Sequence, residues 1–183
     1  MNLKSITKLA INLPMLALLA GCSLPSALLV PFPATPAMKS SPLAHNVCVK
    51  VGAPGHMVFN VVTVTKKQLA ASLALAMRGN GLEGQPTSCA YTLTGAIVHL
   101  AGPPLYLPYL PETFYLTIHY QITSNATGKI VFDLTIRNQY TQSYIFAPPL
   151  GSSETQQRGE ERVFQLNIGQ FETALNAQKF APP

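Results

Sequence analysis

Apolar residues alternate with polar residues over the middle of the chain, with the two-residue period of a β-strand. The clearest alternation runs over residues 114–122, and it resumes over 130–136 after the turn-forming residues 124–128. Two such runs joined by a short turn predict an antiparallel hairpin. The clean alternation on both arms indicates that one face of the sheet packs on a core while the other meets water.

Three further strands are predicted nearer the N-terminus. Alternation over 47–51 and 91–98 indicates two half-buried strands, and a β-branched run over 58–64 predicts a third. A Pro-rich loop over 102–111 separates these strands from the hairpin.

Apolar residues at spacings of three and four predict two helices. Thr65 is a candidate N-cap of the first helix, because Gln68 stands three residues later as in a capping box, and residues 79–81 end the run. The second helix is predicted to begin at about Glu160. The predicted core faces are Leu69, Leu73, Ala76 and Met77 in the first helix and Phe164, Ile168, Phe171 and Leu175 in the second. Together these elements predict an α+β domain over 46–183, with a single antiparallel-rich sheet and two helices packed on one face.

The first 21 residues have the layout of a secretory signal peptide. Lys4 and Lys8 precede an apolar run over 9–19, which is shorter than the roughly 20 residues of a transmembrane helix. The tetrapeptide Leu-Ala-Gly-Cys ending at Cys22 resembles the lipobox of bacterial lipoproteins, in which the cysteine becomes the new N-terminus and carries acyl chains. The alternative is an ordinary secretory signal followed by a chance cysteine.

Residues 22–45 are predicted to be a lipidated cysteine and a Pro-rich tether. Five prolines over 23–45 exclude a continuous helix or a central strand. A pure spacer has no need of the apolar residues over 28–32, which either dock on the domain or lie at the lipid surface. By resemblance to lipoprotein sorting, Ser23 implies an anchor in the outer membrane, with the domain facing the periplasm or the cell surface.

Charge does not indicate a nucleic-acid partner. The chain has 12 Lys and Arg against 7 Asp and Glu, a net charge of +5, but Lys4 and Lys8 belong to the signal peptide. The remaining basic residues are spread thinly and form no basic footprint.

The cysteine count predicts a disulfide. With Cys22 acylated, Cys48 and Cys89 remain as a pair in an oxidising compartment. Two buried thiols or a metal pair are the alternatives. The four histidines lack the spacing of a zinc site, so we expect neither a metal nor a cofactor.

Catalytic candidates are few, and the chain is predicted to be non-enzymatic. Glu160 and Glu161 are adjacent and cannot face each other across a glycosidic bond, so we expect them near a helix N-terminus, where negative charge is favourable. His119 and Asp133 lie on the polar faces of the two hairpin arms, where a Ser–His–Asp arrangement is conceivable. Neither GxSxG nor another nucleophile motif accompanies them.

Three tyrosines are the candidate partner-binding residues: Tyr106 and Tyr109 in the Pro-rich loop, and Tyr115 on the polar face of the hairpin. Exposed aromatic side chains offer a large contact area at little cost in rotamer freedom. The alternative is that the loop folds onto its own sheet.

A set of residues spread along the chain carries a resemblance to known proteins: Cys22, Leu69, Leu73, Gly81, Leu82, residues 90–93, Tyr120, Arg162, Asn167, Ile168 and Phe171. On these residues the chain resembles a family of small, uncharacterised proteobacterial outer-membrane lipoproteins. The resemblance includes the lipobox cysteine and extends over roughly residues 58–178. The predicted architecture is also similar to that of auxiliary lipoproteins in envelope assembly and lipid transport. This resemblance implies a membrane-anchored accessory or assembly subunit that binds another envelope component, most simply a protein. The alternatives are a binder of a small lipid or glycan held between helices and sheet, and, less favoured, a hydrolase.

Overall fold

The computed structural model describes residues 41–52, 56–58, 66–85, 87–102, 111–142 and 152–180. The elements in chain order are β1 (Val47–Val51), β2 (His56–Val58), α1 (Lys66–Gly79), β3 (Tyr91–Ala101), β4 (Glu112–Ser124), β5 (Ile130–Gln142) and α2 (Ser152–Ala177). The signal peptide, residues 22–40 of the predicted tether, and Tyr106 and Tyr109 lie outside these residues. Residues 41–45 of the predicted tether are described, and Leu43 among them is buried in the core.

The five strands form one mixed sheet. Strands β3, β4 and β5 make an antiparallel meander, in which Ile118 of β4 lies opposite Ile97 and Ile136. On the other side of β3, β1 pairs with its first half and β2 with its end, both in parallel. Parallel neighbours need a crossover connection, and α1 lies in the connection from β2 to β3.

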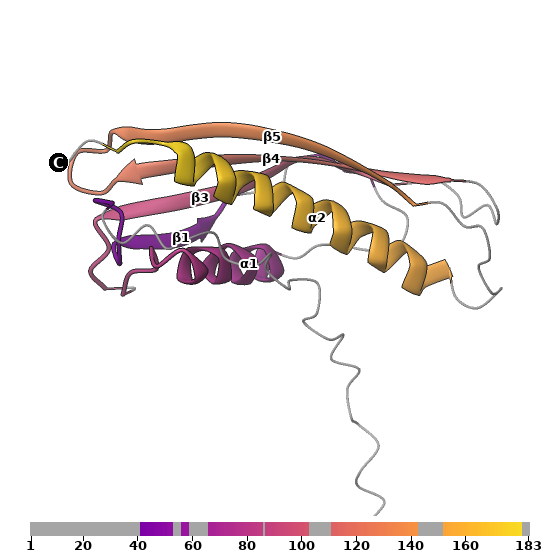
Figure 1. The fold of residues 1–183 in the computed structure, drawn as a ribbon, viewed down its shortest axis with the longest axis horizontal. Coiled ribbons are helices and arrows are strands. Elements are labelled where there is room, and N and C mark those ends of the chain that lie inside the picture. The colour runs from indigo at the N-terminus through magenta and orange to yellow at the C-terminus, as the bar shows by residue number, and fades with distance from the viewer. Residues whose placement is uncertain are drawn as a thin grey trace, which may run out of the picture.

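Both helices cover the same face of the sheet, with α2 under β4 and β5 and α1 under β1 (Figure 1). The fully buried ring of Tyr120 in β4 stacks on that of Phe171 in α2, with centroids 4.2 Å apart. On the neighbouring strand, a Cβ atom at Gly95 would lie 2.5 Å from a methyl group of Leu73, so this position lets α1 approach β3 closely. The α+β fold with two helices on one face is confirmed.

The predicted strand over 47–51, the strand that begins at residue 91, the hairpin and the first helix are all confirmed. Both predicted helical core faces are buried. Of the predicted strand over 58–64, only Val58 is described, at the end of β2.

The predicted start of the second helix is wrong. Helix α2 begins at Ser152, so Glu160 and Glu161 lie in its third turn and not near its N-terminus. The first turns are polar and lack the apolar spacing by which a helix is recognised in a sequence. Tertiary packing stabilises the helix over this stretch. Gly159 packs so closely on the Phe114 ring of β4 that any Cβ atom at this position would overlap the ring.

Candidate functional site

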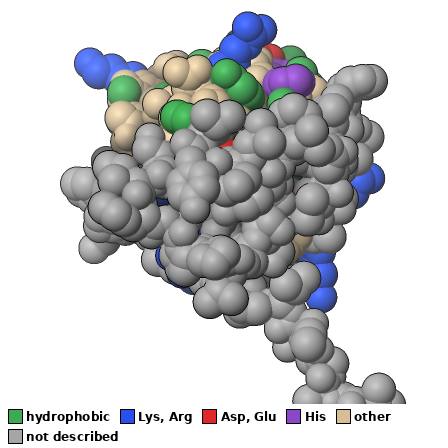
Figure 2. Space-filling model, turned by 90° about the vertical axis from the view of Figure 1, so that its right-hand side faces the viewer, with side chains coloured by type: hydrophobic (Ala, Val, Ile, Leu, Met, Phe, Trp, Pro, Cys, Tyr) green, Lys and Arg blue, Asp and Glu red, His purple; other side chains and the backbone are tan. Residues whose placement is uncertain are grey.

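The open face is the side of the β3–β4–β5 meander that points away from both helices. Strand alternation and register place on this face Thr94, Ala96, Tyr115, Thr117, His119, Gln121, Asp133, Thr135, Arg137 and Gln139. Val98 joins them at the irregularity where the β3–β4 register shifts. In Figure 2, the described surface at the top of the view carries hydrophobic and uncharged polar side chains with a histidine, and basic side chains at its margins.

A hydrogen-bonded cluster occupies the centre of the open face. The Nε2 atom of His119 lies 2.8 Å from Oδ1 of Asp133, and the amide of Gln121 donates to Oδ2 of the same carboxylate at 3.1 Å. The hydrogen bond from His119, followed by that from Gln121, lowers the pKa of Asp133 below its usual range. Both members of the pair are well exposed, so we expect it to contribute little to stability.

Among the described residues, this His–Asp pair has no third component of a hydrolytic triad hydrogen-bonded to it. A nucleophile must lie within hydrogen-bonding distance of the histidine that activates it. Within the described ranges, the hydrogen bond of the His119 side chain is to Asp133, and none to a hydroxyl or thiol is seen. The pair can hydrogen-bond a polar partner, and its geometry alone does not activate a nucleophile.

The exposed apolar side chains of the open face include Tyr115 and Val98. Tyr115 of β4 is 45% exposed and Val98 of β3 is 46% exposed. Tyr115 lies between Ala101 and Gln139, and the neighbouring pair on β4 and β5 is Thr117 and Arg137. An aromatic side chain near amide and guanidinium groups is a combination that contributes both contact area and hydrogen bonds to an interface.

A polar network lies in the interior between α2 and the sheet, where the sequence does not mark it. The buried hydroxyl of Tyr120 donates to Oδ1 of Asn167 at 2.6 Å. The Asn167 amide in turn donates to Oδ1 of Asn138 at 2.7 Å and to the backbone carbonyl of Ile136 at 3.1 Å. Burial, followed by the negative charge of Glu172, raises the pKa of Tyr120. The oxygen and the nitrogen of the Asn167 side chain both take part in these hydrogen bonds. We therefore infer that this cluster holds α2 in place on the sheet.

A second polar contact joins the two helices. Asn80, just beyond α1, donates to the Glu172 carboxylate of α2 at 3.0 Å and accepts a hydrogen bond from Asn176 at 3.1 Å. Burial raises the pKa of Glu172, while the hydrogen bond from Asn80 acts in the opposite direction. These groups lie between the two helices, whereas the stacked rings of Tyr120 and Phe171 lie between α2 and the sheet.

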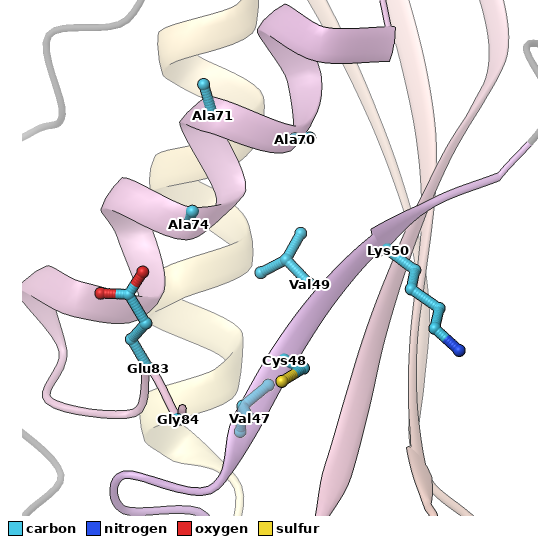
Figure 3. Close-up of a pocket in the computed structure, with 9 residues that line it drawn as sticks. All are labelled: Val47, Cys48, Val49, Lys50, Ala70, Ala71, Ala74, Glu83 and Gly84. Carbon is cyan, nitrogen blue, oxygen red and sulfur yellow. The ribbon is translucent and has the colours of Figure 1, made fainter. Parts of the chain in front are cut away.

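A groove of about 480 Å³ opens between α1 and β1. In Figure 3, Val49 of β1 points toward α1, whereas Lys50 points away from it. The groove is lined by Val47, Cys48, Val49, Lys50, Ala70, Ala71, Ala74, Glu83 and Gly84. An ion pair between Arg78 and Glu83, with N–O distances of 2.6 and 3.1 Å, lies at the end of the groove near Gly84.

Cys48 and Cys89 form a disulfide, with their Cα atoms 5.6 Å apart. It joins β1 to the segment that leads into β3, two elements that also pair in the sheet from Val47 and Tyr91 onward. Within the described ranges, no three side chains of His, Cys, Asp or Glu lie close enough together to hold a metal ion.

Neither helix of the described residues combines the length and the apolar character needed to cross a membrane.

Comparison with known proteins shows likeness in structure and no match in sequence. No protein-family model and no curated protein matches the chain. A protein from Caulobacter crescentus, provisionally assigned as a lipoprotein, is 13% identical with a TM-score of 0.49, over 76% of this chain and 92% of that one. A minor lipoprotein from Acinetobacter baumannii is 14% identical with a TM-score of 0.48, over 74% and 94%. A Xanthomonas campestris protein of the DUF330 family model is 13% identical with a TM-score of 0.48, over 81% and 88%.

Two of these three structures are described as lipoproteins, one of them provisionally. At these identities and TM-scores, the likeness concerns the general arrangement of sheet and helices. It carries no conclusion about a shared activity.

Proposed function

We propose that this chain is a lipoprotein anchored to the outer membrane through Cys22, and that its domain is a non-enzymatic accessory or assembly subunit. The domain binds another envelope component, a protein, through the open face of the sheet. The signal-peptide layout that ends in Leu-Ala-Gly-Cys supports the anchor. Acyl chains hold a protein at a bilayer because each buried methylene contributes about 0.8 kcal/mol.

The observation that carries this proposal is the composition of the open face. Both described helices pack on the opposite face of the sheet, while the open face presents Tyr115 and Val98 beside the His119–Asp133 pair. A sheet that served only as a scaffold would have no need of an exposed aromatic ring amid ordered polar groups. Such a ring loses little conformational freedom on binding and contributes a large buried area.

Replacing Tyr115 by alanine is expected to reduce recovery of the bound envelope protein at least fivefold, because an aromatic anchor at the centre of an interface typically contributes 1 kcal/mol or more. The measurement is crosslinking in native envelopes, affinity purification of the tagged full chain, and quantitative mass spectrometry of the proteins recovered with it.

Leu75→Ala is the matched control. Leu75 is also an exposed apolar side chain, at 36%, but it lies on α1 and not on the open face. We expect this variant to recover the partner at the wild-type level. Equal recovery by Tyr115→Ala and wild type, or equal loss in both variants, would contradict binding through the open face.

A further inference from the structure

The outer edge of β1 has backbone groups that pair with none of the described residues. The Tyr91 N–H donates to the carbonyl of Asn46 and the Gly52 N–H to the carbonyl of Gly95, so even-numbered residues of this segment face β3. The backbone groups of the odd-numbered Val47 point away from β3 and hydrogen-bond to Leu82 and Gly84. Backbone groups alternate sides along a strand, so Val49 and Val51 also point outward. Among the described residues, no strand or loop pairs with these two.

The groove between α1 and β1 runs along this edge. The short segment over 82–84 pairs with β1 at Val47 alone, at one end of the groove, and the groove continues past Val49 beside Ala70 and Ala74 (Figure 3). The small side chains of α1 leave room beside the strand for one more chain. A strand added here would gain hydrogen bonds from the edge and apolar contacts from α1, which is the usual way an extended segment binds a sheet.

The tether contains a segment with the sequence of an edge strand. Residues 28–33 read Leu-Leu-Val-Pro-Phe-Pro, with prolines at positions 31 and 33. Proline lacks an N–H and is tolerated where a strand faces solvent, and it also holds the residue before it in an extended conformation. Both prolines occupy odd-numbered positions, so they lie on the same side of an extended segment. The N–H groups of Leu28, Val30 and Phe32 point to the other side, where they can pair with a neighbouring strand. These three also place their side chains on one common face.

We propose that residues 28–33 add to the sheet as an edge strand antiparallel to β1. They pair with Val49 and Val51 and place Leu28, Val30 and Phe32 in the groove against α1. The connection is long enough: eight residues from Pro33 to Ser41 span up to about 26 Å, whereas β1 from Val47 to Val51 is about 13 Å long. The two prolines then lie on the outer edge and block further pairing.

This arrangement fixes the distance between domain and membrane, a consequence that rests on the proposed acylation of Cys22. With the strand docked, five residues separate Cys22 from Leu28, and the six Cα–Cα steps between the two span at most about 20 Å. Without docking, the 19 steps from Cys22 to Ser41 could extend to about 60 Å. Leu28 lies toward the Val51 end of the groove. There the exposed Lys66 and Lys67 at the start of α1 are placed to face anionic head groups.

Hydrogen exchange of the β1 amides tests the docking without reference to acylation. The full chain is purified in detergent and compared with Val30→Asp, which would place a carboxylate in the groove. We expect the amides of Val49 and Val51 to exchange at least tenfold faster in this variant. Leu29→Asp is the matched control, because Leu29 faces the other side of the added strand, and its exchange should stay within twofold of wild type.

Other results would overturn the proposal. Equal exchange in all three proteins, or equal acceleration in both variants, would show that residues 28–33 do not pair with β1 in this manner. If the amides of Val49 and Val51 lose their protection from exchange when the protein is diluted, a second copy of the chain, and not residues 28–33, pairs with β1. Unchanged exchange of the β4 amides in each variant shows that the domain remains folded. Loss of membrane attachment in Cys22→Ala, tested separately, concerns the anchor alone.

Discussion

Replacing both Cys48 and Cys89 by alanine is expected to lower the free energy of unfolding of the domain by about 4 kcal/mol. The two cysteines are 41 residues apart in sequence, and the loop that they close contains β1 and α1. In the chain-entropy model, opening a loop of this length restores conformational freedom to the unfolded chain and shifts the equilibrium toward it. The effect is large compared with the total stability of about 5–15 kcal/mol typical of a domain.

Urea denaturation of the oxidised wild type and of the double variant measures this difference. Wild-type protein in a reducing buffer serves as the control, because it loses the bond but keeps both sulfur atoms. We expect it to unfold at nearly the same urea concentration as the double variant. Equal midpoints for all three proteins would show that β1 is held by its pairing with β3 alone.

Glu160 is expected to make the domain less stable as the pH rises from about 4.5 to about 8. The residue is 2% exposed, and burial, followed by the negative charge of Glu161, raises the pKa of its carboxyl from 4.5 to about 8. In the unfolded chain the same carboxyl titrates near its ordinary value.

The direction follows from proton binding. Between these two pKa values the folded domain holds a proton on Glu160 that the unfolded chain has released, so each rise in pH favours unfolding. Below pH 4.5 both states are protonated and the residue has no pH-dependent effect. Integrated over the window at about 1.36 kcal/mol per pH unit, the loss reaches about 4 kcal/mol by pH 8.

Glu160→Gln removes the ionisable group while keeping its size and polarity. We expect this variant to match wild type near pH 4.5 and to exceed it by about 4 kcal/mol at pH 8, measured by urea denaturation across that range. Glu161→Gln is the matched control on the same helix. It should keep the pH dependence of wild type with a smaller amplitude, because it removes the neighbouring charge and leaves the burial. Parallel stability curves for wild type and Glu160→Gln would contradict the raised pKa.

The two faces of the sheet have different roles: one packs on the helices, and the other is the proposed binding surface. The face under the helices carries the rings of Tyr120 and Phe171 and the hydrogen bonds of Asn167, which position α2. The open face carries the His119–Asp133 pair and Tyr115, groups exposed enough to meet a partner. Substitutions on the first face are therefore expected to change stability, and those on the second to change binding.

The sequence alone determined the local elements and the fold class. Alternation over 114–122 and 130–136 reports which side of a strand is buried, and a spacing of three to four residues reports the same for a helix. These are properties of short segments, and so the hairpin, α1 and the buried faces could be predicted correctly. The cysteine count likewise predicted which two cysteines could pair, since acylation was expected to occupy the third.

Only the tertiary structure decided how distant segments meet. The parallel pairing of β1 with β3, the stacking of Tyr120 on Phe171 and the bond between Tyr120 and Asn167 join residues far apart in sequence, and no local pattern encodes such contacts. The polar start of α2 could not be predicted for a related reason. This stretch has no apolar periodicity, and its helical structure is stabilised by the close packing of Gly159 on Phe114 of β4. The groove beside β1 is also a tertiary feature. It exists because a helix with small side chains lies beside a strand whose outer edge is paired at Val47 alone among the described residues.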